Sequence, residues 1–301
     1  MFHVKQNEVV YIVKGQLPSN ATRHQIERND VDYKDAKRKD ATRQPLILAV
    51  INQKGGVGKS TTAVNLGAAL GEKKYKVLLV DLDAQGNATT GVGYDKTQCE
   101  ISTYDCLVDD DVNTADAINE TNTNNMWLLP ATIDLAGAET KLVDEIAREF
   151  RLSDALKDVK DDFDFILIDC PPSLGLLTVN ALAAADQLII PIQCEFYALE
   201  GLSKIIDSMN MVKKRINTNL DVFGVVITMY DKRTTLSKDV ANEVENVFGD
   251  KVFKTRIPRT VRISEAPSYG EPITEYEPNG KGAEAYRDLA KEVIKRYKKL
   301  S

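Results

Sequence analysis

From residue 46 onward the chain consists of short, continuously apolar runs separated by longer segments with helical periodicity. Runs that stay apolar at every position predict strands buried on both faces, as in parallel sheets covered by helices on either side. The alternation of strand and helix therefore predicts an α/β fold, a single doubly wound, mostly parallel sheet flanked by helices. The predicted strands are 46–52, 77–82, 126–129, 163–169, 187–193 and 222–229, and the predicted helices are 60–72, 134–149, 174–184, 199–216 and 235–248.

The first 44 residues lack this pattern and are polar, with a high density of charge after Arg23. A segment this short buries too little apolar surface to fold alone. We therefore predict a partly ordered arm of net positive charge over 1–44, followed by one globular domain over 45–301. Within the arm, 9–13 is apolar enough for a short strand, and 26–39 has the composition of a charged helix.

Composition narrows the class of protein. Hydrophobic residues make up 43% of the 301 residues, which is enough for a globular core. The first residues do not show the order of charged, apolar and small residues that marks a signal peptide, so we expect a cytoplasmic protein. Four cysteines without a C-x-x-C pair, and two histidines that precede the predicted domain, leave little for zinc or histidine chemistry. The net charge of −6 argues against a uniformly basic coat, but the basic run 251–262 contains no acid and can bind phosphate locally.

The candidate chemistry begins with a glycine-rich turn between the first strand and the first helix. A helix N-terminus behind such a turn presents backbone N–H groups to a phosphate chain. The standard pattern G-x-x-x-x-G-K-[ST] is not met, because Gln53 stands at its first glycine, and a second lysine, Lys54, precedes the loop. Glycines permit close backbone approach, Lys59 supplies charge for the β- and γ-phosphates, and the Ser60 hydroxyl can ligate Mg²⁺. The predicted cradle is Gly55, Gly56, Val57, Gly58, Lys59, Ser60 and Thr61.

Two further strand ends carry acids. In the strand 77–82 the apolar run Val77-Leu78-Leu79-Val80 is followed by Asp81-Leu82-Asp83. The strand 163–169 ends at Asp169. Since ligands of such sheets bind at the carboxyl ends of the strands, we expect these acids to converge on the phosphate loop. Asp169 is predicted to hold Mg²⁺ through water, with Ser60 and Asp83 also near the metal, and Asp83 is predicted to orient the attacking water.

With these features the chain resembles the ParA family of partition ATPases, a branch of the deviant Walker A group that also contains MinD. The resemblance covers about residues 46–299 and rests on the segments NQKGGVGKST, LLVDLDAQGNATTG, LLPATIDLAGAE, ILIDCPPSLG, IPIQCEFYALEGL, VITMYDKR and IPRTVRISEAPSYG. It implies a P-loop ATPase that uses ATP and Mg²⁺ and forms a sandwich homodimer around ATP. Lys54 would reach the phosphates of the other subunit, and Asp83 would be the catalytic aspartate.

The resemblance also implies partners. Hydrolysis would be weak alone and stimulated by a centromere-binding ParB-type protein together with DNA. Thr228, Met229 and Pro258 fall in segments that border the adenine. Arg233, Arg259 and Arg262 match DNA-contacting arginines, and contacts to backbone phosphates would make binding to double-stranded DNA insensitive to sequence and sensitive to salt. A nucleoid-associated location in the cytoplasm would follow. Ala84 and Thr260 depart from the family's usual proline and asparagine, without removing a charge that the mechanism needs.

Three alternatives share the phosphate loop. In a nitrogenase-type iron protein the cluster cysteine lies further along its loop than Cys170 does here. A metabolic ligase or kinase would need a substrate-binding insert, for which the sequence offers no candidate. A MinD-like membrane cycle is suggested by the last segment, 283–300, which has an apolar stripe with lysines around it. Its alanine and tyrosines suit packing on the body better than insertion into lipid, so membrane binding is not favoured.

Overall fold

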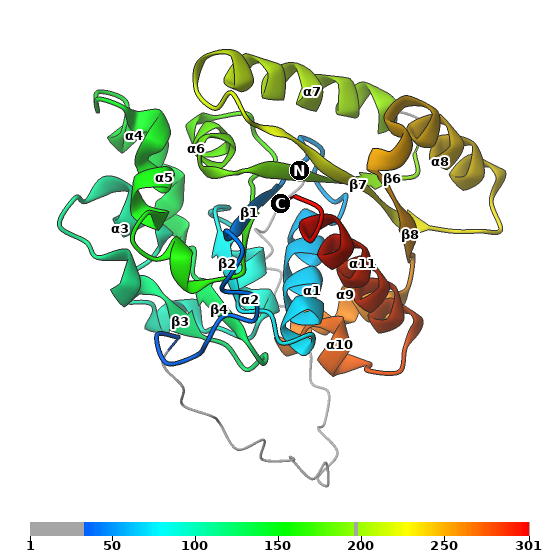
Figure 1. Cartoon of the computed structure of the whole chain (residues 1–301), viewed down its shortest axis with the longest axis horizontal. Helices are drawn as coiled ribbons and strands as arrows, with labels where there is room; N and C mark the ends of the chain where they lie inside the picture. The colour runs from blue at the N-terminus through cyan, green and yellow to red at the C-terminus, as the bar shows by residue number, and fades with distance from the viewer. Residues whose placement is uncertain (1–32, 196–197, 301) are drawn as a thin grey trace, which may run out of the picture. The chain divides into compact units, whose positions relative to one another are not determined.

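The computed structural model describes residues 33–195 and 198–300, and residues 31–301 form one compact unit. Its centre is an eight-stranded sheet in the order β3-β4-β2-β5-β1-β6-β7-β8, in which every pairing is parallel except that of β3 with β4 (Figure 1). The predicted α/β fold with one doubly wound sheet is confirmed. The strands are β1 (Leu46–Val50), β2 (Val77–Asp81), β3 (Asn119–Glu120), β4 (Met126–Leu129), β5 (Phe165–Asp169), β6 (Gln187–Gln193), β7 (Asp221–Tyr230) and β8 (Val252–Pro258).

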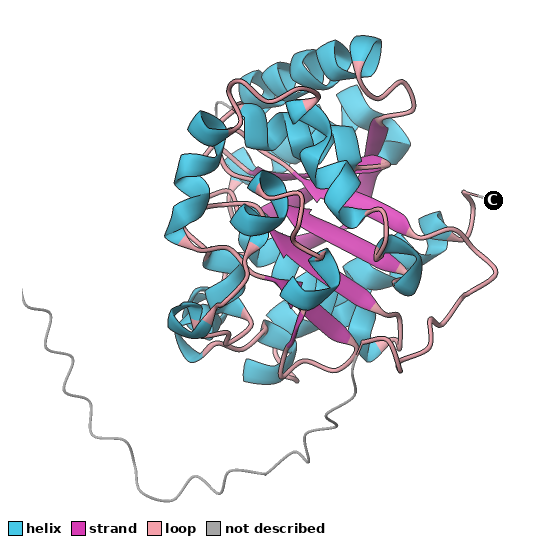
Figure 2. Ribbon diagram, turned by 90° about the vertical axis from the view of Figure 1, so that its left-hand side faces the viewer, coloured by secondary structure: helices cyan, strands magenta, loops and turns pink. Residues whose placement is uncertain are grey.

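Helices cover both faces of the sheet (Figure 2). One core cluster joins one face to α3, α5, α6, α7 and α8, and the other joins the opposite face to α1, α9, α10 and α11. Consecutive residues of β1 alternate between the two clusters, as a strand buried on both faces requires. The helices are α1 (Lys59–Glu72), α2 (Asn87–Gly91), α3 (Thr103–Val108), α4 (Ala138–Lys141), α5 (Arg151–Leu156), α6 (Leu176–Ala184), α7 (Ala198–Arg215), α8 (Thr235–Phe248), α9 (Val261–Glu265), α10 (Ile273–Tyr276) and α11 (Lys281–Tyr297).

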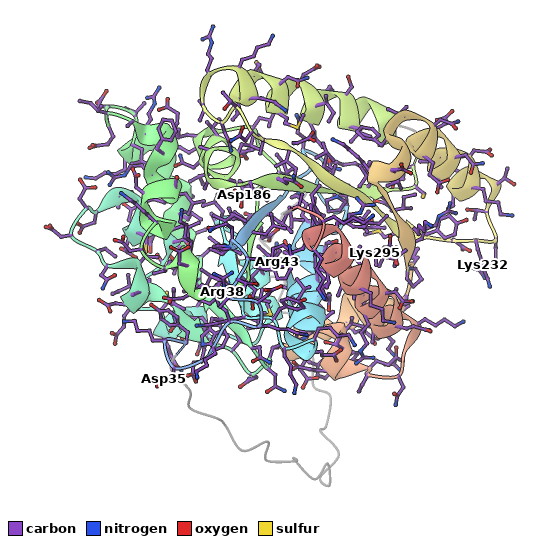
Figure 3. The ribbon with its side chains drawn as sticks, viewed as in Figure 1. Asp35, Arg38, Arg43, Asp186, Lys232 and Lys295 are labelled. Atoms are coloured by element: carbon purple, nitrogen blue, oxygen red, sulfur yellow. The ribbon has the colours of Figure 1, made fainter. Side chains whose placement is uncertain are left out.

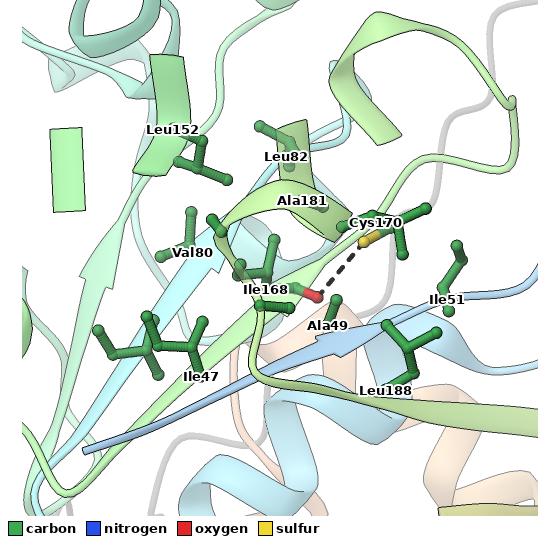
Figure 4. Packing of buried hydrophobic residues seen from close by; sticks show 14 of the residues in the cluster. Ile47, Ala49, Ile51, Val80, Leu82, Leu152, Ile168, Cys170, Ala181 and Leu188 are labelled. Carbon is green, nitrogen blue, oxygen red and sulfur yellow. Dashed lines mark hydrogen bonds between the residues drawn. The ribbon is translucent and has the colours of Figure 1, made fainter. Parts of the chain in front are cut away.

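The first core cluster surrounds the end of β5 (Figure 4). Ile168 and Cys170 are fully buried there among aliphatic side chains of β1 and β6, and the Cys170 thiol donates to the Ile168 carbonyl at 3.7 Å. Burial raises the pKa of this thiol, so it stays protonated. All four cysteines are free.

One predicted helix is wrong. The segment 134–149 forms a 3₁₀ turn (Ile133–Gly137), the single turn α4 and a second 3₁₀ turn (Arg148–Phe150), and Ala147 has a left-handed φ of 56°. A side chain of α6 fixes the break, since Asn180 accepts from the Leu152 N–H at 3.0 Å and donates to the Arg148 carbonyl at 2.9 Å. Because the helix is interrupted, the apolar residues in the second half of this segment do not face the core, and Ile146 is 92% exposed.

Two strands were not predicted. β3 has only two residues, and β8 lies at the edge of the sheet. In β8 the buried Phe253 and Ile257 are interrupted by Lys254 and Arg256, so its sequence has no continuous apolar run. The basic run of the sequence is therefore in part an edge strand, which agrees with the preference for charged side chains at sheet edges.

The arm predicted over 1–44 lies largely outside the described residues, and so do the strand over 9–13 and the first part of the helix over 26–39. The described part of that helix, residues 33–39, forms turns and bends instead. The N–H groups of Lys39 and Asp40 donate to the carboxylate of Asp164 at 2.9 and 3.1 Å instead of forming the hydrogen bonds of a helix. Residues 33–45, which we call the strap, thus lie against the sheet just before β5.

The C-terminal segment forms α11, whose apolar stripe faces the core. Tyr286, Leu289, Val293 and Tyr297 are buried, and the Tyr297 hydroxyl donates to the Gln44 carbonyl at 2.9 Å. The stripe that raised the membrane alternative is therefore covered by the protein itself. Within residues 33–195 and 198–300 no helix has the length and apolar character needed to cross a membrane.

Candidate nucleotide-binding site

The loop between β1 and α1 has the backbone of a phosphate cradle. Gly56 and Gly58 have φ angles of 76° and 88°, in the left-handed region that side chains disfavour. α1 begins at Lys59, and its first N–H groups lie behind the loop. The buried Asn52 fixes the entrance, since its amide accepts from the Lys54 N–H at 3.0 Å and donates to the Pro191 carbonyl at 2.7 Å. The loop can thus direct several N–H groups at an anion.

The two lysines of the loop occupy different places. Lys59 is buried, 7% exposed, and its ammonium donates to the Lys54 carbonyl at 3.3 Å across the loop. Burial lowers the pKa of Lys59, while the negative charge of Asp169 opposes that shift. The Lys54 side chain is 47% exposed and forms an ion pair with Glu195, beyond the end of β6. Sequence reasoning missed Glu195.

Asp169 ends β5 beside Asp81, with which it pairs across the parallel strands β2 and β5. Both carboxylates are fully buried, and neither oxygen of Asp169 has a hydrogen-bond donor. Burial, and then the charge of Asp81, raise the pKa of Asp169 well above its ordinary value, while the Ser60 hydroxyl and Lys59 act in the opposite direction. A divalent cation would compensate the two oxygens of Asp169 that have no hydrogen-bond donor, so the residues fit Mg²⁺.

Asp83 lies in the turn that follows β2. Its N–H donates to Asp81 at 3.2 Å, and its carboxylate accepts from the Gln85 N–H at 3.0 Å. Asp81 accepts from the N–H and the hydroxyl of Thr89, both at 2.7 Å, and burial raises its pKa to about 6. Asp81 thus positions the backbone of Asp83, a role that sequence reasoning missed, although the two acids of Asp81-Leu82-Asp83 signalled it.

The predicted adenine-bordering residues lie at the ends of β7 and β8. The buried Thr228 hydroxyl donates to the Val57 carbonyl at 2.8 Å, so this side chain supports the phosphate loop directly. Met229 has a left-handed φ of 50°, and Tyr230 pairs with Pro258 across the two strands. Thr228 therefore lies against the phosphate loop, and the adenine contacts of Thr228, Met229 and Pro258 stay a prediction.

The three predicted DNA-contacting arginines lie near β8. Arg233 forms an ion pair with Asp231 at 2.7 Å, and Arg262 pairs with Glu265 at 3.0 Å. Arg259 is exposed, and its backbone N–H donates to the Tyr230 carbonyl at 3.3 Å. A cavity of about 1010 Å³ is lined by Arg233 and Arg259, with residues of α11 opposite them. The structure brings these two arginines to one hollow, and Arg262 does not line it.

A glycine-rich loop behind a parallel strand, a buried lysine and acids on two neighbouring strand ends define a P-loop nucleotide-hydrolysing protein. The AAA domain family matches residues 46–222. The chain is 57% identical over 247 residues to the sporulation initiation inhibitor protein Soj of Bacillus subtilis, covering 82% of this chain and 97% of that one. It is 45% identical to the chromosome partitioning protein ParA of Myxococcus xanthus, covering 91% and 96%.

Solved structures of similar proteins have the same fold as this chain. A cobyrinic acid a,c-diamide synthase of Mycobacterium smegmatis with bound ADP and magnesium has a TM-score of 0.75 at 40% identity, covering 86% of this chain and 97% of that one. The cell division ATPase MinD of Pyrococcus furiosus has a TM-score of 0.70 at 31% identity, covering 84% and 99%. This chain belongs to the Soj/ParA family of partitioning ATPases. It is an ATPase with ATP and Mg²⁺ as its cofactors, as the sequence predicted.

Proposed function

We propose that the chain segregates plasmid or chromosomal DNA as an ATP-dependent homodimer that binds DNA non-specifically and releases it after hydrolysis stimulated by a ParB-type partner. The observation that carries the proposal is the pair of lysines in one phosphate loop, in a chain whose relatives are named for chromosome partitioning. Such a protein works in the cytoplasm on the nucleoid.

The dimer follows from the different exposure of the two lysines. Lys59 is inside the cradle and supplies the charge that the chain's own nucleotide needs. Lys54 is at the rim, where its exposed ammonium forms, among the described residues, an ion pair with one other exposed side chain, Glu195. An exposed ion pair contributes little, about 0–1 kcal/mol, so it can be exchanged for the phosphate of a nucleotide held by a second copy. ATP would then lie between two subunits, each contributing Lys54 to the other.

Hydrolysis requires a water directed at the γ-phosphate. We assign this task to Asp83, because its backbone is held by Asp81 while its carboxylate accepts, among the described residues, a hydrogen bond from the Gln85 N–H alone. Lys59 and the N–H groups of the loop would stabilise charge on the phosphates. Ser60 would ligate Mg²⁺ directly and Asp169 through water, and the metal would neutralise phosphate charge.

The DNA contact is assigned to Arg233, Arg259 and Arg262. Of the three, Arg259 is exposed and forms no ion pair among the described residues, so binding a phosphate would break none. Its charge does act on Asp231, whose pKa it helps to lower. Arg233 and Arg262 would exchange their acids for DNA.

We expect Arg259→Glu to abolish binding to a random-sequence duplex while ATP-dependent dimerisation stays intact. The reason is that a like charge would face the DNA backbone at a position whose side chain forms no hydrogen bond or ion pair among the described residues. Fluorescence anisotropy with labelled duplex and light scattering measure the two properties. Lys141→Glu on α4 makes the same kind of charge change at another exposed position and should bind DNA as the parent does. If dimerisation is lost together with DNA binding, Arg259 has a structural role and the assignment is wrong.

A further inference from the structure

We infer that the chain has a second DNA-binding surface, at the edge of the sheet where the strands begin, built by the strap and its neighbours. It comprises residues 33–43, 73–76 and 295–299, and we call it the amino-edge surface. The inference rests on the proposed function for the identity of the polyanion, whereas the surface itself follows from contacts and charge. Arg38, Arg43 and Lys295 can be located in Figure 3.

The strap is fixed to the sheet by one buried acid. The fully buried Asp164 carboxylate accepts from the N–H groups of Lys39, Asp40 and Lys76, and from the Arg38 guanidinium at 3.4 Å. A buried carboxylate with four donors is satisfied only when the strap lies in this place. The strap backbone is therefore held where its side chains reach solvent beyond the sheet.

Aromatic contacts fix the start of the strap. Tyr33 is buried and stacks on Phe163 with ring centroids 5.5 Å apart. The Lys76 ammonium lies 5.2 Å from the centroid of Phe163 and 5.6 Å from that of Trp127, and it donates to the Ala36 carbonyl at 2.9 Å. Cation–π contacts and a hydrogen bond thus secure the strap before Arg38.

The three segments of the surface are contiguous. The Lys39 ammonium lies 4.5 Å from the centroid of Tyr75 and donates to the Lys73 carbonyl. The Tyr75 ring meets that of Tyr297 edge-on at 6.4 Å, and the Arg43 guanidinium lies 5.8 Å from the centroid of Tyr297. The turn between α1 and β2, the strap and the end of α11 therefore meet around two tyrosines.

The charge of this surface is far from that of the whole chain. Its three segments contain twelve lysines and arginines and two aspartates, although the net charge of the chain is −6. Six lysines among them have no acidic partner within residues 33–195 and 198–300: Lys37, Lys39, Lys73, Lys74, Lys295 and Lys299. Near β8, in contrast, Lys251, Arg256 and Arg262 each form an ion pair. Cations without acids nearby gain most from a polyanion.

DNA fits this surface better than a lipid bilayer does. A helix that lies on a bilayer needs an exposed apolar face, but Val293 and Tyr297 of α11 are buried. Among the large apolar side chains of the three segments and their direct neighbours, only Leu300 is exposed, at 50%. Lysines on a polar surface suit contacts with backbone phosphates that carry no sequence information.

The position of the surface is compatible with the dimer. The phosphate loop, Asp83 and Asp169 lie at the carboxyl ends of β1, β2 and β5, whereas the strap precedes β1 and the turn after α1 precedes β2. A dimer closed over the nucleotides would leave both amino-edge surfaces accessible. One DNA-bound dimer would then have cations at β8 and at the amino edge of each subunit.

The test compares two double variants of the full chain. Lys37 and Lys74 are exposed and make no side-chain contact in the described residues, so Lys37→Glu with Lys74→Glu should fold as the parent does. With ATP, Mg²⁺ and a random-sequence duplex, we expect its affinity to fall about tenfold or more and the slope of log K against log salt to decrease in magnitude by about 2. Lys141→Glu with Lys214→Glu, two exposed lysines elsewhere, is the matched control and should keep the slope of the parent.

Each other outcome decides against the inference. Unchanged affinity and slope in the Lys37 and Lys74 variant, with a parent that binds DNA, would overturn the second surface and leave the proposed function standing. An equal loss in the control would show an effect of net charge alone. If the parent binds no DNA, the proposed function itself fails. Binding to phosphatidylglycerol vesicles that requires Lys37 and Lys74 would then assign the surface to lipid instead.

Discussion

Lys59→Ala is expected to weaken ATP binding about 10- to 150-fold, because a charge-assisted hydrogen bond to phosphate contributes about 1.5–3 kcal/mol and no other cation is buried in the described cradle. Among the buried polar residues around the described phosphate loop, Lys59 alone carries a positive charge, and its ammonium has a loop carbonyl as its hydrogen-bond partner. In the proposed function dimerisation and DNA binding depend on ATP, so both should be lost with it.

Lys54→Ala is the matched control for this experiment. It removes the same functional group from the same loop, but from the exposed rim, where the side chain pairs with Glu195. Calorimetric titration with ATP and Mg²⁺ should show near-parental affinity for Lys54→Ala in the monomer and the full loss for Lys59→Ala, while circular dichroism reports that both fold. Near-parental ATP affinity in Lys59→Ala would refute its assignment as the phosphate-binding lysine.

Asp83→Ala is expected to lower the rate of ATP hydrolysis about 100-fold or more, the usual effect of losing a general base or water-positioning group. ATP binding should persist, because Asp83 is absent from the cradle and its only side-chain hydrogen bond is with the N–H of Gln85 in its own turn. The variant should accumulate as an ATP dimer that stays on DNA. Single-turnover hydrolysis and ATP affinity, measured side by side, separate the two effects.

The exposed Asp111, whose side chain makes no contact in the described residues, provides the control Asp111→Ala for loss of an acid elsewhere. That variant should hydrolyse ATP at the rate of the parent. Undiminished turnover in Asp83→Ala would remove Asp83 from the reaction and leave the water to another group.

Much of the site could be predicted from sequence, because parallel strands bring their carboxyl ends to one edge. Continuous apolar runs identified β2 and β5. The acids at the carboxyl ends of these strands, Asp83 and Asp169, were therefore expected near the loop after β1. The function proposed for the surplus Lys54 involves a second subunit, which no local sequence pattern describes. The role of Asp81 was missed because, in sequence, the buried last residue of a strand resembles an acid of the turn that follows.

Tertiary contacts explain what could not be predicted. The segment 134–149 has helical periodicity, but Asn180 of α6 satisfies the backbone where the helix breaks. The strap looked like part of a charged helix, and its actual course depends on Asp164, more than 120 residues further along the chain. Neither partner is visible in a local window, since propensity is a weak guide wherever a buried side chain offers other hydrogen bonds.

The measurement that tests the central claim most directly is binding of the unmodified full chain to a random-sequence DNA duplex with ATP, with ADP and without nucleotide, over a series of salt concentrations. A partition ATPase of the proposed kind binds strongly with ATP only, and its affinity falls steeply as salt rises because the contacts are with phosphates. Binding that is equal in all three nucleotide conditions, or absent in all of them, would contradict the account.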